Sequence, residues 1–164
     1  MKRIGRLSDT HGYIHPKVSD FFMQCDEIWH AGDIGNIDTA DKLAVLKPFK
    51  AVFGNIDGGS LRLDYKEIEL FHCEDVKVLM MHIGGYPGRY STNARKLIAE
   101  HQPKLFISGH SHILKVMPDA NNNLLHINPG SAGKQGLHQM ITMVRFVIDG
   151  DRIRDLEVFE TKKS

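Results

Sequence analysis

The sequence has few cysteines and no long apolar run. Its only cysteines, Cys25 and Cys73, are too far apart to form a CxxC motif. Two thiols are too few for a disulfide framework or a cysteine zinc finger, so we expect a cytoplasmic location. No apolar stretch is long enough to cross a bilayer, and residues 1–5 lack the hydrophobic region of a signal peptide. We therefore expect no membrane partner.

An excess of charge of one sign is also lacking. The 21 basic and 20 acidic residues give a formal net charge of +1, which provides no electrostatic attraction for nucleic acid. With a single tryptophan, the sequence shows no row of aromatic side chains on which the bases of a single-stranded nucleic acid could stack, so a nucleic-acid partner is not expected. The length of 164 residues, with 41% hydrophobic and 25% charged side chains, fits one globular domain over residues 1–164.

In the first half of the chain, predicted strands alternate with predicted helices. Pro16 favours a helix over about 16–24, and Asp38 or Thr39 can cap a second helix that ends before Pro48. These helices have the length that crossovers between parallel strands require. The strands that they would connect are predicted at 4–7, 27–31 and 51–53.

The second half is predicted to be mostly strands. Residues 65–71 and 76–81 form a predicted hairpin around a turn at His72–Asp75, and Ser91 or Thr92 can cap a helix. Two sheets packed together, with helices outside, would accommodate this pattern, which gives an α/β (α+β) fold class. Further strands are predicted at 105–107, 113–117, 124–127, 140–148 and 152–159.

Ten histidines are present, and several follow predicted strand ends together with acids and glycines. In α/β sheets the carboxyl ends of strands are where sites assemble, and glycine lets the backbone turn sharply beside an ion. Five segments have this placement: Asp9-Thr10-His11, Gly32-Asp33, Gly54-Asn55-Ile56-Asp57, Met81-His82 and Gly109-His110-Ser111-His112.

The donors in these segments are carboxylates, imidazoles and an amide, without a thiolate. This mixture favours Mn²⁺, and Zn²⁺, Fe, Co²⁺ or Ni²⁺ would also be compatible. One ion takes about four to six ligands, so a larger set indicates two divalent transition-metal ions that share a carboxylate. The candidate metal ligands are seven: Asp9, His11, Asp33, Asn55, His82, His110 and His112.

In their order along the chain, the five segments resemble the motifs of the calcineurin-like metallophosphoesterases: D-x-H, G-D, G-N-x-[D/E], H and G-H-x-H. The small size and Asn128-Pro129-Gly130-Ser131 resemble the compact YfcE-like phosphodiesterases most, and the match runs from residue 7 to about residue 133. The resemblance implies a two-sheet β-sandwich flanked by helices, with metals at the carboxyl ends of strands. It also implies hydrolysis of a small phosphodiester or phosphate ester by a hydroxide bridging two metals. Some relatives are oligomers, so a homo-oligomer is compatible with it.

Residue roles follow from the same motifs. Asp9, His11 and His112 would hold the first metal, Asn55, His82 and His110 the second, and Asp33 would bridge the two. The residues expected to take part in catalysis are Asp33, Asn55, Asp57 and His82.

One position departs from the family pattern. Many relatives carry a histidine after the asparagine, where it is thought to protonate the leaving oxygen, but here Ile56 stands. Isoleucine cannot transfer a proton, so good leaving groups such as aryl esters should be hydrolysed better than alkyl ones. The compact subgroup also tends to lack that histidine. Asp57 keeps the family's acidic position, and we expect it to support the metal ligands from behind, for example by orienting a metal-bound histidine.

Other interpretations compete with an enzyme. Each motif alone can be an ordinary turn, and the chain could be a non-catalytic, protein-binding scaffold on this fold, like the small retromer subunit. Every family ligand position is filled here, which favours an enzyme, whereas the scaffold lacks some ligand histidines. Outside the motifs, His30 could line the cleft, and residues 84–89 could wrap a substrate phosphate or form a plain surface loop. The remaining histidines, at 15, 72, 101, 126 and 138, are interpreted as surface or packing residues.

Overall fold

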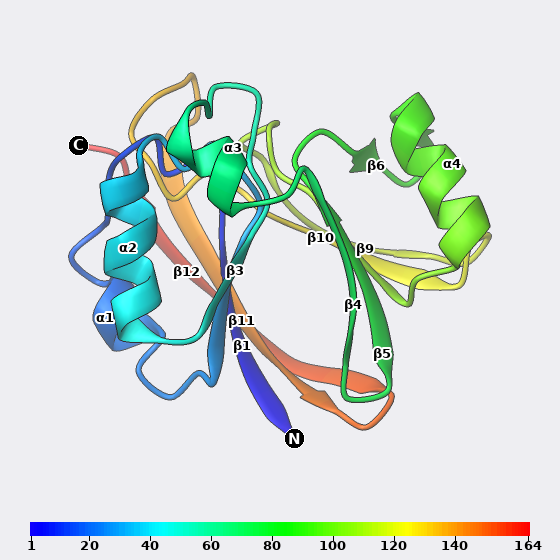
Figure 1. Ribbon diagram of the computed structural model, residues 1–164. Coiled ribbons are helices and arrows are strands. Elements are labelled where there is room, and N and C mark those ends of the chain that lie inside the picture. The colour runs from blue at the N-terminus through cyan, green and yellow to red at the C-terminus, as the bar shows by residue number, and fades with distance from the viewer.

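Two five-stranded sheets form the centre of the computed structural model, which describes residues 1–164 (Figure 1). The first sheet has the order β12-β11-β1-β2-β3. Its β1, β2 and β3 are parallel, and β11 is antiparallel to β1. The bounds are β1 Lys2–Leu7, β2 Glu27–His30, β3 Phe49–Ala51, β11 Met140–Asp149 and β12 Arg152–Lys162.

The second sheet has the order β4-β5-β8-β10-β9. Its three central strands are parallel, and the edge strands β4 and β9 are antiparallel to their neighbours. The bounds are β4 Ile68–Cys73, β5 Val76–Met81, β8 Leu105–Ile107, β9 Leu114–Asp119 and β10 Leu124–Pro129.

The helices lie outside the sheets (Figure 1). The bounds are α1 Val18–Phe21, α2 Ile37–Leu46, α3 Ser60–Asp64 and α4 Thr92–His101. The side of the first sheet near α1 and α2 carries an apolar cluster that includes Phe22 and Leu43, while Ala94 and Ile98 of α4 pack with Phe106 of the second sheet. None of these helices has the length and apolar character needed to cross a membrane.

The largest core cluster lies between the two sheets. It joins 14 buried residues, among them Trp29 of β2, Met80 of β5 and Ile127 of β10. Alternation along each strand turns one set of side chains into this core and the other set toward the helices. The predicted two-sheet sandwich flanked by helices is confirmed, while the expectation of one domain over 1–164 stays a prediction.

Several predicted elements differ in extent. The helix expected over 16–24 is a single turn, α1, because the chain turns away after Phe22 to join β2. The second helix is capped by Asn36, whose side chain accepts from the Thr39 N–H, rather than by Asp38 or Thr39. The strand expected at 51–53 is β3, two residues earlier. By contrast, β5 and β8 have the predicted bounds, and Ser91 caps α4 as predicted.

Two elements had no counterpart in the sequence analysis. One is α3, and the other is the short hairpin of β6 (Gly85–Tyr86) and β7 (Arg89–Tyr90). Two-residue strands leave no alternation to detect, although Pro87-Gly88 between them is a turn signal. The expected hairpin between β4 and β5 is present, with Glu74 in the left-handed region at the turn.

Candidate metal centre

The loops after β1 and β2 are tied together by their backbones. The N–H groups of Asp9, His11 and Gly12 donate to the carbonyls of Gly32, Asp33 and Ile34 at 2.7–3.0 Å. Because β1 and β2 are parallel, both loops lie at the same edge of the first sheet. This ladder brings the Asp9-Thr10-His11 and Gly32-Asp33 segments into one site.

The second sheet delivers its segments to the same place. The Gly109 N–H after β8 donates to the His82 carbonyl at 3.0 Å, and the His82 Nδ1 atom lies 2.8 Å from the Ala31 carbonyl oxygen of the first sheet. The carboxyl ends of β2, β5 and β8 therefore converge, as the sequence predicted.

Two glycines allow the loops to approach this closely. A Cβ atom at Gly54 would lie 2.1 Å from Asp33 Oδ1, and one at Gly109 would lie 2.3 Å from the Ser8 hydroxyl. Both contacts are far shorter than van der Waals separation. Any larger residue at these positions would push the candidate ligands apart.

The candidate ligands form two groups. Asp9, His11 and His112 make the first, and Asp33, His82 and His110 make the second, with each group's donor atoms within 4.8 Å of one another. Asp33 Oδ2 lies 3.2 Å from His82 Nε2 and 3.6 Å from His11 Nε2, so it faces both groups. Asn55 joins the second group through its Oδ1 atom, 3.1 Å from His110 Nδ1. The structure thus brings all seven predicted ligands together.

Buried atoms without partners show that these residues fit metal ions. Asp9 Oδ1, His11 Nε2 and His82 Nε2 are buried and have no hydrogen-bond partner. Leaving such atoms unpaired costs free energy, so a missing group is expected between them. Two ligand atoms about 2.1 Å from one cation lie roughly 3.0–3.5 Å apart. The 3.3 Å between Asp9 Oδ1 and His112 Nε2 and the 3.2 Å between Asp33 Oδ2 and His82 Nε2 match this spacing.

Hydrogen bonds behind the ligands fix their orientation. Asp9 Oδ2 accepts from the Ser8 hydroxyl at 2.6 Å and from the backbone N–H of His110 at 3.1 Å, which leaves Oδ1 free. His82 uses Nδ1 on the Ala31 carbonyl, which leaves Nε2 free. Such partners select the ring nitrogen that faces a metal.

The charges of the centre favour ionised carboxylates. Burial alone would raise the pKa values of Asp9 and Asp33, but neighbouring imidazoles, His112 and His82 for Asp9 and His82 for Asp33, outweigh it, so both pKa values lie below the ordinary value. Burial would likewise lower the pKa of His82, yet the two carboxylates raise it. Anionic oxygens are the form that binds a divalent cation.

Asp57 supports the ligands from behind, but through their backbones and not by orienting a histidine. Its carboxylate accepts three backbone N–H groups, from Ile34 at 3.0 Å, Gly35 at 2.9 Å and Gly54 at 2.8 Å. These amides flank Asp33 and Asn55 in two separate loops. Asp57 therefore holds the two ligand-bearing loops against each other through their backbones.

His30 does not line the cleft. It is fully buried, accepts the Gly32 N–H at Nδ1 and lies 2.9 Å from the Thr10 hydroxyl through Nε2. Thr10 in turn donates to the Ile34 carbonyl. Burial lowers the pKa of His30 to about 3, so the ring is neutral and connects the loops after β1 and β2.

Two further supporting residues escaped the sequence analysis. His138 packs edge-on against the His112 ring, with centroids 5.0 Å apart, and its Nε2 atom lies 2.8 Å from the Gly133 carbonyl oxygen. Ser8 anchors Asp9. The position of Ser8 beside the first motif was a usable signal, whereas nothing in the sequence places His138 next to His112.

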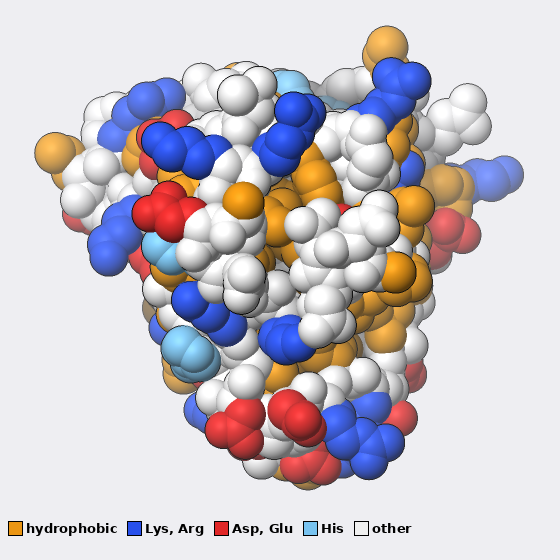
Figure 2. Space-filling view, turned by 90° about the vertical axis from the view of Figure 1, so that its right-hand side faces the viewer, with side chains coloured by type: hydrophobic (Ala, Val, Ile, Leu, Met, Phe, Trp, Pro, Cys, Tyr) orange, Lys and Arg blue, Asp and Glu red, His pale blue; other side chains and the backbone are white.

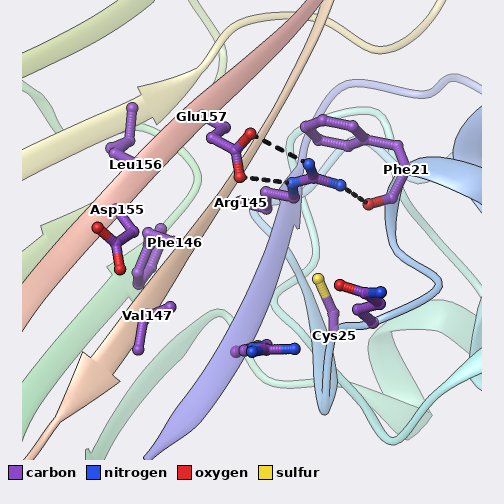
Figure 3. Close-up of a pocket in the computed structure, with 10 residues that line it drawn as sticks. Phe21, Cys25, Arg145, Phe146, Val147, Asp155, Leu156 and Glu157 are labelled. Carbon is purple, nitrogen blue, oxygen red and sulfur yellow. Dashed lines mark hydrogen bonds and ion pairs between the residues drawn. The ribbon is translucent and has the colours of Figure 1, made fainter.

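A pocket elsewhere on the molecule lacks such chemistry (Figure 3). It lies between α1, β1, β11 and β12, and Arg3 and Arg145 both line it. The Arg145 guanidinium is paired with both carboxylate oxygens of Glu157 at 3.1 Å and with the Phe21 carbonyl at 2.8 Å. No buried unpaired polar atom belongs to its lining. The convergent donors are confined to the metal centre.

The chain is similar to several known proteins. A probable metallophosphoesterase of Methanothermobacter thermautotrophicus is 32% identical over 165 residues, covering 96% of this chain and 92% of that protein. Among solved structures, Vps29 of Chaetomium thermophilum has a TM-score of 0.76 at 13% identity, with both chains covered completely. A structure described as a novel archaeal phosphodiesterase has a TM-score of 0.73 at 20% identity, covering 96% of this chain and 99% of that one. At these identities the two structures show the fold alone.

The family itself is shown by the sequence match. Residues 1–151 match the calcineurin-like phosphoesterase superfamily domain. This family implies divalent metals, and the structure holds two groups of side chains that could bind them. Family membership also supports a phosphoesterase activity in general. On the extent of that match and on the archaeal relative, this chain belongs to the calcineurin-like phosphoesterase superfamily.

Proposed function

We propose that the protein is a phosphodiesterase that depends on two divalent transition-metal ions, with Mn²⁺ favoured. Asp9, His11 and His112 would hold one ion, Asn55, His82 and His110 the other, and Asp33 would contact both. The observation that carries this proposal is the convergence of buried, unpaired donor atoms on Asp9, His11 and His82.

The protein's own part in the reaction is to hold the metal ligands in position. When bound, the two cations supply positive charge for the phosphate oxygens and lower the pKa of water, so that hydroxide is available as a nucleophile at neutral pH. Ser8 and the Ala31 carbonyl fix Asp9 and His82 in the ligating orientation, and Asp57 keeps the Asp33 and Asn55 loops together.

Two pockets beside the second group support a diester rather than a monoester. One pocket is lined by Asn55 and His82, and the other by His110. Ile83 and Ser91 line both pockets, so the two are neighbours. A phosphodiester has two organic arms, and neighbouring pockets beside one phosphate position would receive one arm each.

The alternative is a non-catalytic scaffold, which the likeness to Vps29 keeps open. Complete ligand groups favour the enzyme, because a binding surface does not require buried imidazoles with free nitrogens. Nucleic acid is a less suitable substrate. Figure 2 shows basic and acidic side chains interspersed over one face, and no single sign covers it. A cytoplasmic location and a homo-oligomer stay predictions.

The test is hydrolysis of bis(4-nitrophenyl) phosphate by protein freed of metal and then titrated with Mn²⁺. We expect turnover that rises with Mn²⁺, is abolished by chelation and falls by at least about a hundredfold in Asp33→Asn and His82→Gln. Lys96→Gln, an exposed change on α4, serves as the matched control. Binding of two ions without turnover of any ester would support the scaffold, and activity that survives exhaustive chelation would exclude the metal mechanism.

A further inference from the structure

The pocket lined by His110 has a distinctive charge. It lies between the β6–β7 hairpin, the loop after β8 and the strands β9 and β10. Arg89 and Lys115 are the permanently charged residues of its lining, which contains no carboxylate. Neither cation forms a salt bridge with an acid anywhere in the chain, although Lys115 Nζ lies 3.8 Å from the centre of the Tyr86 ring.

The pocket lined by Asn55 and His82 is different. Its cation, Arg62, donates to the Asp57 carbonyl and lies over the Phe53 ring, and Glu67 shares the lining. Its positive charge therefore has an acidic residue nearby. Of these two pockets, only the one beside His110 presents two cations without a counter-ion.

A buried acceptor without a partner also lines this pocket. His126 is fully buried, its Nδ1 lies 3.2 Å from the Phe106 carbonyl oxygen, and its Nε2 has no partner. Burial lowers the pKa of His126 to about 4, so the ring is neutral, and Nε2 offers a lone pair. Close by, the Ser111 hydroxyl accepts from Asn128 and from the Ile113 N–H, so its own proton remains to be donated.

We propose that this pocket binds a second anionic group, a carboxylate or a phosphate, carried on one arm of the substrate. The proposal rests on the proposed function, because the ester phosphate would lie at the neighbouring metal centre. Arg89 and Lys115 would pair with the anion, and a hydroxyl near it could donate to His126. Preferred substrates would then be phosphodiesters with one acidic arm rather than two neutral arms.

Competitive inhibition tests this selectivity. Hydrolysis of bis(4-nitrophenyl) phosphate by the Mn²⁺-loaded protein is inhibited with alkyl phosphates, ω-carboxyalkyl phosphates and alkane bisphosphates of matched, increasing chain length. At the best length we expect the acidic ligand to inhibit about tenfold more strongly than the alkyl phosphate. The carboxylate and bisphosphate series identify which anion the pocket prefers.

Variants show whether the two cations cause the preference. In Arg89→Gln and Lys115→Gln the preference should fall to about threefold, and in the double variant to about onefold. Lys96→Gln, which lies outside both pockets, should keep the full preference, and added salt should shrink it. Equal inhibition by acidic and alkyl ligands at every length, or a preference that persists in the double variant, would overturn the proposal.

The same ligands separate this proposal from the proposed function. If no ester is hydrolysed, the phosphodiesterase proposal fails, and calorimetric binding of the same ligand pairs to the Mn²⁺-loaded protein still tests the pocket. If neutral diesters are hydrolysed but acidic and alkyl ligands bind equally, the activity stands and the anion site fails.

Discussion

At the scale of single residues, the metal centre is built on unusual backbone conformations. Nine non-glycine residues have positive φ, and five of them are candidate ligands: Asp9, His11, Asp33, His110 and His112, with φ between 47° and 72°. A left-handed conformation costs an L-residue roughly 1–2 kcal/mol, so it persists only where surrounding structure enforces it. These strained conformations thus lower the stability of the fold while they direct the five side chains toward the metal centre.

His110 allows this cost to be measured, because its side chain is exposed and its φ is 72°. In metal-free protein, His110→Gly should be more stable than His110→Ala by about 1 kcal/mol, since glycine has no Cβ to strain. Urea unfolding in the presence of a chelator measures the difference. At Lys96, in the middle of α4, the order of stability should reverse, with Lys96→Ala more stable than Lys96→Gly. Equal stability of the two His110 variants would show that the backbone there is unstrained.

The residue between Asn55 and Asp57 gives a prediction about leaving groups. Ile56 is 49% exposed and cannot donate a proton from its side chain, so the leaving oxygen has no acid from this position. Ile56→His should raise kcat/KM for alkyl esters by about tenfold or more, and for 4-nitrophenyl esters much less. Ile56→Gln, which is polar but not an acid, is the control. Equal effects on the two classes would contradict the interpretation of Ile56 as a missing acid.

At the scale of elements, the strand ends were predictable and much of their support was not. Each motif follows an apolar run, so Asp9, Asp33 and His82 could be placed at carboxyl ends from the sequence. The parallel order of β1 and β2, and of β5 and β8, then brings these ends to shared edges. The role of Asp57 was beyond reach, because it depends on where three backbone amides from two loops point.

The same limit applies to histidines outside the motifs. The sequence could not assign His30 to the link between two loops, since its partner Thr10 lies 20 residues away and on a different strand end. Hydrogen bonds of this kind are set by tertiary structure, not by local spacing. Short elements such as β6 and β7 fail for another reason, because two residues carry no periodicity.

Strand β1 contains a buried charge that has no counter-ion. Arg6 is fully buried, its Nη1 contacts the Met80 sulfur at 3.3 Å, and its Nε and Nη2 atoms have no partner. Burial lowers the pKa of this guanidinium to about 9. A charge in such a position costs several kcal/mol unless it is paired.

Replacing this charge should therefore stabilise the protein. Arg6→Met has a similar length and no polar atoms to satisfy, and we expect it to raise the free energy of unfolding by about 1–4 kcal/mol. Arg3→Met, on the exposed part of the same strand, should change it by no more than about 0.5 kcal/mol. Urea unfolding of both variants measures the contrast. A destabilised Arg6→Met would mean that the guanidinium has buried partners, such as ordered water.

At the scale of the whole molecule, the two sheets are joined by polar contacts at the metal end and by apolar packing below it. The 14-residue core between the sheets includes Ile4, Trp29, Met80 and Ile107, on the strands that lead into the loops carrying the ligands. His82 on one sheet and Ala31 on the other are linked directly. Motion of one sheet relative to the other would separate the ligands that each sheet contributes to the centre. We therefore expect global stability and metal affinity to be coupled.

Two neutral, buried histidines make that stability depend on pH. His30 links the loops of the first sheet, and His126 lies in the second sheet, stacked on Phe106. Burial lowers their pKa values to about 3 and about 4 in the folded protein, whereas unfolded histidine has a pKa of about 6.5. Between these values the unfolded chain takes up protons that the folded protein does not. The stability that these two histidines contribute is therefore fully present above about pH 6.5 and is lost as pH falls below it.

The size of this loss follows from the difference in proton uptake. Between about pH 7 and pH 5, each histidine that stays neutral in the folded state should cost about 2 kcal/mol of unfolding free energy. His126→Gln, whose amide can still donate to the Phe106 carbonyl, should flatten the pH dependence by about that amount in metal-free protein. Urea unfolding across this range measures both slopes, and His72→Gln, an exposed change on β4, is the control. Parallel curves for the wild type and His126→Gln would show that His126 has the same pKa in the folded and unfolded chains, because only unequal proton uptake by the two makes stability depend on pH.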